Sequence, residues 1–373
     1  MKKAIFYFSS INYNFLRQRP QQLFHNLRRV SQDNGKDYEI FYVDPPQLKL
    51  KSEGSVSTNH KDQKNVIMPI PGHISVLGRL GSLIRPLISY LINRRLNVYN
   101  FDVKIAILAS PIWEPYVSEE DFDMICYDYM DSLELYGFNE RHSRLVEKSD
   151  IIFTTAHQLK KEIFNMFKKD AVLVSNGVDP EFFREKSNYN IDFNKKNKVV
   201  GYVGAVYDWI DLGMIYHAAR SLNDVDFVFI GPLTSINQKK AEDPNKPINV
   251  YFLGQKNYEM VPGYVNMFDV AIIPFQSGDV ALSTDPIKVY EYFALGKPVV
   301  ATAVKELERF NDGKVLKMAD DSEEFINSLK FFLENDNITW QEARKDISEE
   351  NSWMEKSREI LKHIDNYLHN KKI

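Results

Sequence analysis

The chain has 373 residues, of which 44% are hydrophobic and 26% are charged. This composition is that of a soluble globular protein, and at roughly 100 to 200 residues per domain the length predicts two domains. The net charge of −4 argues against a surface built for nucleic acid, and the single cysteine, Cys126, excludes an intrachain disulfide and a cysteine-rich zinc site. The first apolar run stops at Ser9 without the pattern of a signal peptide, and no apolar window is long enough to span a bilayer. We expect a cytoplasmic protein, soluble or peripheral to the inner face of the cell membrane.

Short runs rich in Val, Ile, Phe and Tyr alternate with helical patterns, which predicts parallel sheets and an α/β fold. In the first half, the expected strands are 4–8, 39–43, 66–69, 103–108, 124–127 and 151–154, with helices at 19–29 and 138–147. A polar stretch, 186–198, then interrupts the pattern. In the second half, the expected strands are 199–203, 226–230, 250–253, 270–274, 298–302 and 314–317, with helices at 212–222, 286–295, 322–334 and 353–367.

The stretch 74–100 carries four arginines and no acidic residue, with leucines and isoleucines between them. This pattern is typical of an amphipathic helix on an anionic membrane, but also of an ordinary packed helix with a basic solvent face. The sequence leaves both interpretations open, with the packed helix favoured.

The segment 283–300 contains the most informative pattern. Asp285 is a candidate N-cap, Pro286 suits a first helical turn, and Gly296 ends the helix before a buried strand. Such a helix begins near the carboxyl end of a parallel sheet, where free amides and the helix dipole bind phosphate. Lys288 could add a positive charge there and Glu291 could accept hydrogen bonds from a ribose, although the two could equally form a surface ion pair.

Several further motifs occur in a consistent order: Gly201 to Ala205, Phe229 to Pro232, Val250 to Gly254, Phe268 to Pro274, Ser175 to Phe182, and Asn351 to Trp353. Together with 283–300 they resemble the GT-B glycosyltransferases, in particular family 4-like members of the family 1/4 group that build teichuronic acid or exopolysaccharides. The resemblance implies two Rossmann-like doubly wound domains facing a central cleft. We expect residues 1–180 to bind the acceptor and residues 195–350 to bind a nucleotide-sugar, with a helix of about 351–373 returning to the first domain.

By this resemblance the second domain holds the donor. Glu291 would bind the ribose, while Lys288 and the amides of Ser283, Thr284 and Asp285 would meet the diphosphate. The backbone at Gly204 and Ala205 would approach the phosphates, and the loop of Leu253, Gly254 and Gln255 would face the base. An ordinary strand-to-helix turn is the alternative for Gly204.

Two positions depart from the pattern of the retaining family 4 enzymes. Ser283 stands where those enzymes carry the first carboxylate of an E-x7-E pair. The turn after Gly204 reads Val206 to Asp211, with two carboxylates in place of an Arg and a Lys. A retaining mechanism is therefore in doubt, and this loop must either point away from the diphosphate or serve the sugar.

In the first domain, Asp128 and Asp131 follow a predicted strand, so they should lie at its carboxyl end. Asp131 is the candidate general base for an inverting transfer, and helix or turn capping is its alternative role. Arg17 and Arg19 could hold an acceptor or the departing phosphate, or lie on the surface. Trp113 could stack on a sugar ring, although packing is the commoner role for a buried Trp.

The eight histidines show no metal-binding spacing, and the two D-x-D strings precede predicted strands, at the wrong end of the sheet for a nucleotide-bound metal. We expect no required metal or cofactor, although magnesium could accompany the nucleotide. The leading hypothesis is a glycosyltransferase that uses a UDP-sugar and a polysaccharide or lipid-linked acceptor in cell-surface glycan synthesis. A GT-B nucleotide-sugar epimerase and a non-catalytic nucleotide-sugar-binding module are the alternatives.

Overall fold

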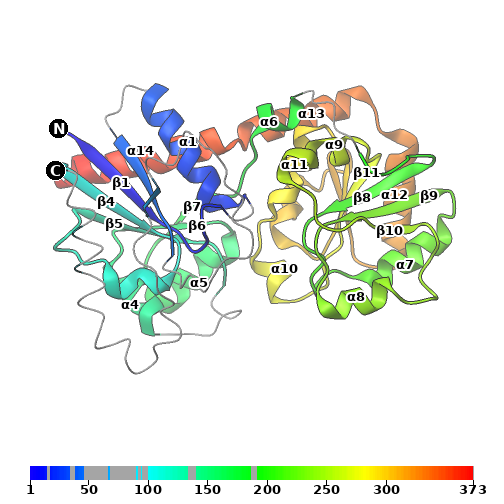
Figure 1. The fold of residues 1–373 in the computed structure, drawn as a ribbon, viewed down its shortest axis with the longest axis horizontal. Helices are drawn as coiled ribbons and strands as arrows, with labels where there is room; N and C mark the ends of the chain where they lie inside the picture. The colour runs from blue at the N-terminus through cyan, green and yellow to red at the C-terminus, as the bar shows by residue number, and fades with distance from the viewer. Residues whose placement is uncertain are drawn as a thin grey trace, which may run out of the picture. The chain divides into compact units, whose positions relative to one another are not determined.

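The computed structural model describes residues 1–14, 17–33, 38–45, 66–67, 90, 94, 100–132, 140–185 and 191–372. The chain separates into two compact units (Figure 1). The first unit contains 1–155, 159–174 and 356–373, and the second contains 156–158 and 175–355. Most of the stretch 74–100, with its predicted amphipathic helix, lies outside the described residues.

The first unit is built on a parallel sheet with the strand order β3-β2-β1-β4-β5-β6-β7. Its strands are β1 (Lys3–Phe8), β2 (Tyr38–Val43), β3 (Val66–Ile67), β4 (Val103–Leu108), β5 (Met124–Tyr129), β6 (Ile151–Thr154) and β7 (Val172–Leu173). They alternate with α1 (Arg19–Asp33), a 3-10 helix (Pro111–Tyr116), α4 (Glu140–Lys148) and α5 (His157–Phe167). The central strands are buried along almost their whole length, as expected for a parallel sheet covered on both faces.

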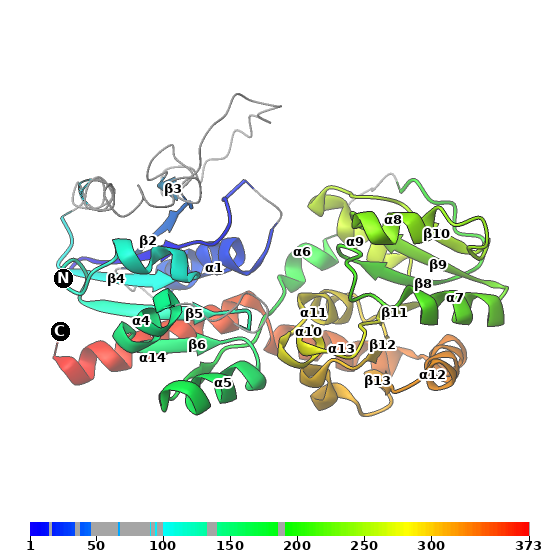
Figure 2. The ribbon, with the colours of Figure 1, turned by 90° about the horizontal axis from the view of Figure 1, so that it is seen from below.

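The second unit repeats the arrangement, with the strand order β10-β9-β8-β11-β12-β13. Its strands are β8 (Lys198–Val203), β9 (Val225–Ile230), β10 (Val250–Phe252), β11 (Val270–Ile273), β12 (Val299–Thr302) and β13 (Leu316–Ala319). The helices are α6 (Pro180–Arg184), α7 (Leu212–Ser221), α8 (Ser235–Ala241), α9 (Val261–Asn266), α10 (Asp279–Ser283), α11 (Ile287–Ala294), α12 (Ser322–Asn335) and α13 (Ile338–Glu350), with 3-10 turns at Tyr258–Met260 and Lys305–Phe310. Helices α7 and α12 lie side by side on one face of the sheet (Figure 2).

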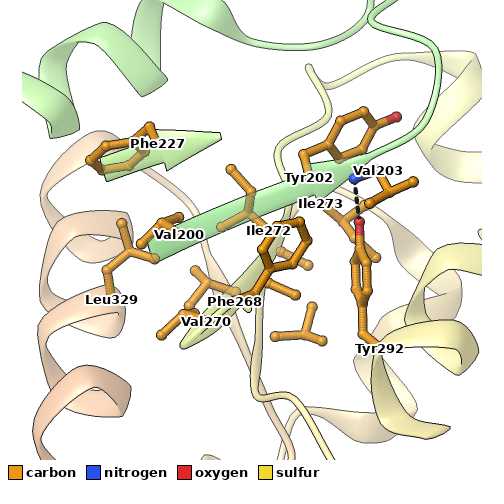
Figure 3. Close-up of a cluster of buried hydrophobic side chains, with 14 of the residues drawn as sticks. Val200, Tyr202, Val203, Phe227, Phe268, Val270, Ile272, Ile273, Tyr292 and Leu329 are labelled. Carbon is orange, nitrogen blue, oxygen red and sulfur yellow. Dashed lines mark hydrogen bonds between the residues drawn. The ribbon is translucent and has the colours of Figure 1, made fainter. Parts of the chain in front are cut away.

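The core of the second unit forms around β8 (Figure 3). The ring of Phe268 packs directly on Gly201, where a Cβ atom would lie 2.1 Å from a ring carbon. Beyond that point, the amide of Val203 donates to the hydroxyl of Tyr292, over 2.9 Å. Because Tyr292 belongs to α11, this buried bond fixes α11 to the carboxyl end of β8.

The last helix, α14 (Trp353–Lys371), connects the two units along the chain, and its residues from Lys356 onward belong to the first. There the carboxylate of Asp365 accepts a hydrogen bond from Tyr38, over 2.6 Å. None of the helices in the described part of the chain is long and apolar enough to cross a membrane.

The predicted strands agree with the structure to within two residues at each described end, and the α/β class is confirmed. The strand expected at 314–317 is displaced to Leu316–Ala319, because the carboxylate of Asp312 accepts from the amides of Lys314 and Val315 and holds them in a turn. The short strand β7 and several helices, among them α5, α8 and α13, were missed. Helix α13 gives the clearest reason. The residues that it buries are Arg344 and Ser348, so it has no apolar stripe to mark it.

Candidate functional site

Three glycines line the carboxyl edge of the second sheet. Gly204, Gly231 and Gly254 follow β8, β9 and β10 and have φ angles of 152°, 146° and 68°. The amide of Gly204 donates to Ile230 over 2.8 Å, and that of Gly231 donates to Gly254 over 2.9 Å. A Cβ atom on Gly231 would lie 2.0 Å from the carbonyl oxygen of Gly204. Packing against Gly204 therefore requires glycine at position 231, whereas a Cβ atom on Gly254 would meet nothing within 4 Å, so a ligand can approach the backbone closely there.

The two carboxylates of the loop after Gly204 have local hydrogen-bond partners. Asp208 accepts from the hydroxyl of Thr234 over 2.6 Å, and Asp211 caps α7 by accepting from the amide of Met214 over 2.9 Å. These contacts account for both residues without a ligand. Asp208 and Asp211, which follow the predicted phosphate site at Gly204, therefore have structural roles.

Lys288 and Glu291 form an ion pair on α11, with 2.7 Å between Nζ and Oε2. The Glu291 side chain is 2% exposed and that of Lys288 is 28% exposed. Burial and the Glu291 carboxylate both raise the pKa of Tyr202, which places Glu291 near the end of β8. The ion pair anticipated as the alternative is thus present, and ribose binding by Glu291 stays a prediction.

Asp285 does not cap α11, so that prediction was wrong. The N-cap position is Pro286, and the Asp285 side chain is fully buried instead. Its carboxylate accepts from the amide of Asn176 over 2.6 Å, from the hydroxyl of Tyr290 over 2.8 Å and from Nη2 of Arg309 over 3.1 Å. Burial raises the pKa of Asp285, and Arg309 opposes that shift. This cluster fixes the segment that leads into α11.

The other predicted donor residues lie around the same edge. Ser283 is buried, and its hydroxyl donates over 2.6 Å to the carbonyl of Asp279 in its own helix. Thr284 follows this helix and is half-buried, and its amide donates to the carbonyl of Val280 over 3.1 Å, so the prediction that this amide meets the diphosphate was wrong. The remaining members are half-buried Ala205, Leu253 and Gly254, and exposed Gln255.

In the first unit, Arg19 and Asp128 form a buried ion pair. Nε and Nη2 of Arg19 both donate to the carboxylate, the shortest contact being 2.8 Å, and the hydroxyl of Tyr7 donates to it over 2.7 Å. The side chains of Arg19 and Asp128 are 3% and 1% exposed. This contact joins the start of α1 to the end of β5, a structural role that the sequence did not predict for either residue.

The other predicted residues of the first unit differ in exposure. Asp131 lies two residues beyond β5 and is exposed. Its pKa is raised because the surrounding protein desolvates its carboxyl and because the Asp128 carboxylate is nearby. Arg17 is also exposed. Trp113 is fully buried, with its Nε1 donating to the carbonyl of Ser9 over 2.8 Å, so it has no face available for a sugar ring.

Asp44 is a polar residue at the carboxyl edge of the first sheet that the sequence analysis missed. It follows β2 directly, the same signal that drew attention to Asp131, and it is 4% exposed. Its Oδ1 accepts from the amide of Tyr13 over 2.7 Å, and burial raises its pKa to about 6. Among the described residues, no group of three or more His, Cys, Asp or Glu side chains could hold a metal ion.

Comparison with known proteins finds a family-model match within the second unit. Residues 183–352 match the model of the family described as glycosyl transferases group 1. The chain is 25% identical over 229 residues to TuaH of Bacillus subtilis (strain 168), whose name assigns it to teichuronic acid biosynthesis as a glycosyltransferase. That alignment covers 59% of this chain and 58% of TuaH, so it spans little more than half of this relative.

Solved structures match over nearly the whole chain. HepE of Anabaena, in complex with UDP and glucose, has a TM-score of 0.68 at 14% identity and is covered to 99%, with 97% of this chain aligned. WaaG, a glycosyltransferase involved in lipopolysaccharide biosynthesis, has a TM-score of 0.63 at 12% identity, over 95% of this chain and 98% of its own. Such identities show the fold. The chain therefore has the GT-B fold, and its residues 183–352 match the glycosyl transferases group 1 model.

Proposed function

We propose that the protein is a glycosyltransferase that moves a sugar from a nucleotide-diphosphate donor to a polysaccharide or lipid-linked acceptor in cell-surface glycan synthesis. The observation that carries the proposal is the carboxyl edge of the second unit. Its glycine-lined backbone lies beside a buried carboxylate, Glu291, on a helix with Lys288 in its first turn. Helix amides, a lysine and closely approachable backbone are the groups that bind a diphosphate, and a carboxylate suits ribose hydroxyls.

UDP is the proposed nucleotide. HepE, which shares the fold, binds UDP and glucose, and TuaH is named for teichuronic acid biosynthesis. We assign the loop of Leu253, Gly254 and Gln255 to the base. No metal or cofactor is part of the proposed reaction, since the diphosphate would be met by Lys288 and the amides that begin α11.

For the acceptor side, we propose an inverting transfer with Asp131 as general base. Asp131 lies beyond the carboxyl end of β5, is exposed to solvent, and has a raised pKa, which brings a carboxylate closer to the neutral range in which a base works best. Arg19, through its ion pair with Asp128, would position this end of β5. Arg17, which is exposed, is assigned to the acceptor or to the departing phosphate.

Contact with an anionic membrane is part of the proposal. Helix α5 exposes Phe164, which is 50% exposed, with exposed Lys160 and Lys161 one turn before it and exposed Lys168 one turn after it, the Nζ of Lys168 lying 5.6 Å from the centroid of the Phe164 ring. Exposed apolar groups among lysines fit an anionic lipid surface, where each cation contributes roughly 1 kcal/mol. Sedimentation with phosphatidylglycerol vesicles should fall in Phe164→Ser and persist in Ile338→Ser, a control exposed in the second unit. Equal sedimentation of the two variants would exclude α5 from membrane binding.

Incubation with a panel of UDP-, GDP- and dTDP-sugars tests the activity. Release of the nucleotide that depends on an added glycan or lipid-linked acceptor supports transfer. A changed sugar without acceptor would identify the epimerase alternative, and binding without any turnover would identify the non-catalytic module. Asp131→Asn should bind donor normally and lose turnover; full turnover in that variant would contradict its role as the base.

A further inference from the structure

We propose that Tyr207, stacked on Trp209, contacts the sugar ring of the donor and contributes to the choice of that sugar. The inference rests on the proposed function, because it places the sugar moiety of the same nucleotide donor. It concerns the loop after β8, from which the cations expected at a diphosphate are missing. Neither residue belongs to the donor set predicted from the sequence.

The two rings form an ordered aromatic surface. Their centroids lie 4.5 Å apart with an interplanar angle of 29°, so one face of Tyr207 is covered by Trp209. Trp209 is half-buried and packs against the core, whereas Tyr207 remains 45% exposed. An exposed aromatic ring supported from behind by a second ring is a flat surface for a ligand rather than a core residue.

Hydrogen bonds to the backbone hold this loop in place. The side-chain amide of Asn237, which is fully buried, donates to the carbonyls of Val206 and Tyr207 over 3.1 and 2.7 Å. On the other side, the amide of Gln276 donates to the carbonyl of Trp209 over 2.7 Å. Since the rings are fixed before a ligand arrives, little conformational entropy is lost on binding.

The chemistry of the loop favours a neutral ligand group. Residues 205–211 contain no cation and two carboxylates, those of Asp208 and Asp211, which repel phosphate. A pyranose ring is uncharged and has a face of C–H groups, and the electron-rich face of an aromatic ring attracts such weakly positive hydrogens. The sugar is therefore the better partner than the diphosphate.

The position of the loop separates the sugar from the base. The base is assigned to the Gly254 loop after β10, and β9 lies between β10 and β8 in the sheet. The carbonyl of Trp209 is bonded on the opposite side, to the segment that follows β11 and leads into α10. Tyr207 and Glu291 both raise the pKa of Tyr202, after its burial, so each lies within electrostatic reach of the end of β8.

Calorimetric titration with UDP and with three UDP-sugars, those of glucose, galactose and N-acetylglucosamine, tests the inference. For the sugar that the wild type binds most tightly, Tyr207→Ala should lose about three- to ten-fold in affinity, while its affinity for UDP stays unchanged. Tyr207→Phe should retain the wild-type affinities because it keeps the ring. Tyr216→Ala, which truncates a half-buried Tyr of α7 in the same unit, should behave as wild type.

Three results would overturn the inference. Equal losses for UDP and the UDP-sugar would mean that Tyr207 contacts the nucleotide. Unchanged affinity for both would mean that it contacts neither, and the proposed function would stand. If the wild type binds neither UDP nor any of these UDP-sugars, the proposed UDP donor fails and the inference fails with it. Matching thermal midpoints of the variants would verify that each is folded.

Discussion

Replacing Asp128 by Asn should destabilise the first unit strongly. The substitution keeps the shape of the side chain and removes the charge that pairs with Arg19. Both groups are at most 3% exposed, and two nitrogens of the guanidinium donate to the carboxylate. A cation desolvated to this degree and deprived of its carboxylate raises the free energy of the folded state.

The size of the effect follows from this burial. Removing one partner of a buried ion pair typically costs about 3–5 kcal/mol, whereas replacing both partners by apolar groups is often neutral. The bond from Tyr7, 2.7 Å long, can persist to the amide oxygen of Asn, so we expect about 3 kcal/mol, the lower end of that range. Arg19→Met with Asp128→Leu in one chain should recover most of this loss.

Urea unfolding measures the change. At a slope of about 3 kcal/mol per molar urea, a loss of 3 kcal/mol lowers the midpoint of the transition by about 1 M. Glu120→Gln, which removes an exposed carboxylate of the same unit, should shift it by less than about 0.5 kcal/mol. A loss of less than about 1 kcal/mol of unfolding free energy in Asp128→Asn would show that Arg19 does not need its buried partner. A double variant no more stable than Asp128→Asn would show the same.

Three further changes test the packing and the electrostatics of the two units. Asp44 has a pKa of about 6 in the folded protein, above its ordinary value of 3.8, so its contribution to stability is fully present below pH 3.8 and is lost as the pH rises through 6. In thermal melts, Asp44→Asn should therefore be more stable than wild type at pH 7.5, by up to about 3 kcal/mol, and the difference should disappear at about pH 3. Gly231→Ala should lower the free energy of unfolding by at least about 1–3 kcal/mol and weaken UDP binding, because the new Cβ meets the carbonyl of Gly204 and φ is positive. An unchanged melting temperature would be inconsistent with this contact. Asn249→Ala should lower the free energy of unfolding in urea by about 1–3 kcal/mol, since the side-chain amide donates to three backbone carbonyls. An unchanged free energy would show that water replaces this amide.

The fold could be predicted from the sequence because every strand except the two-residue β7 is a short apolar run with its own boundary signals. The beginning of α11 after Pro286 and the ion pair of Lys288 and Glu291 also follow from local spacing. Local patterns of this kind need no knowledge of distant residues. The order of the strands in both sheets then follows the usual doubly wound arrangement.

Contacts between residues far apart in the chain could not be predicted in this way. Asp285 looked like a helix cap, and its burial depends on Arg309, 24 positions away, and on Asn176, 109 positions away. Arg19 looked like a ligand-binding cation for the same reason, since its partner Asp128 is 109 positions away. Neither distance leaves a periodic signal, so only the assembled sheet reveals that these charges are paired.

The carboxyl edge of the second unit is proposed to hold a nucleotide diphosphate with its ribose on Glu291. Binding of UDP and of 2′-deoxy-UDP to the wild type and to Glu291→Ala measures this contact. Glu308→Ala is the matched control, because Glu308 forms an ion pair of the same i,i+3 spacing with Lys305 but is 54% exposed. We expect the wild type and Glu308→Ala to bind UDP about ten-fold more tightly than 2′-deoxy-UDP, the equivalent of roughly 1.4 kcal/mol for a hydrogen bond to a charged group. Glu291→Ala should lose this preference. An undiminished preference for UDP in Glu291→Ala would contradict the contact between the ribose and Glu291.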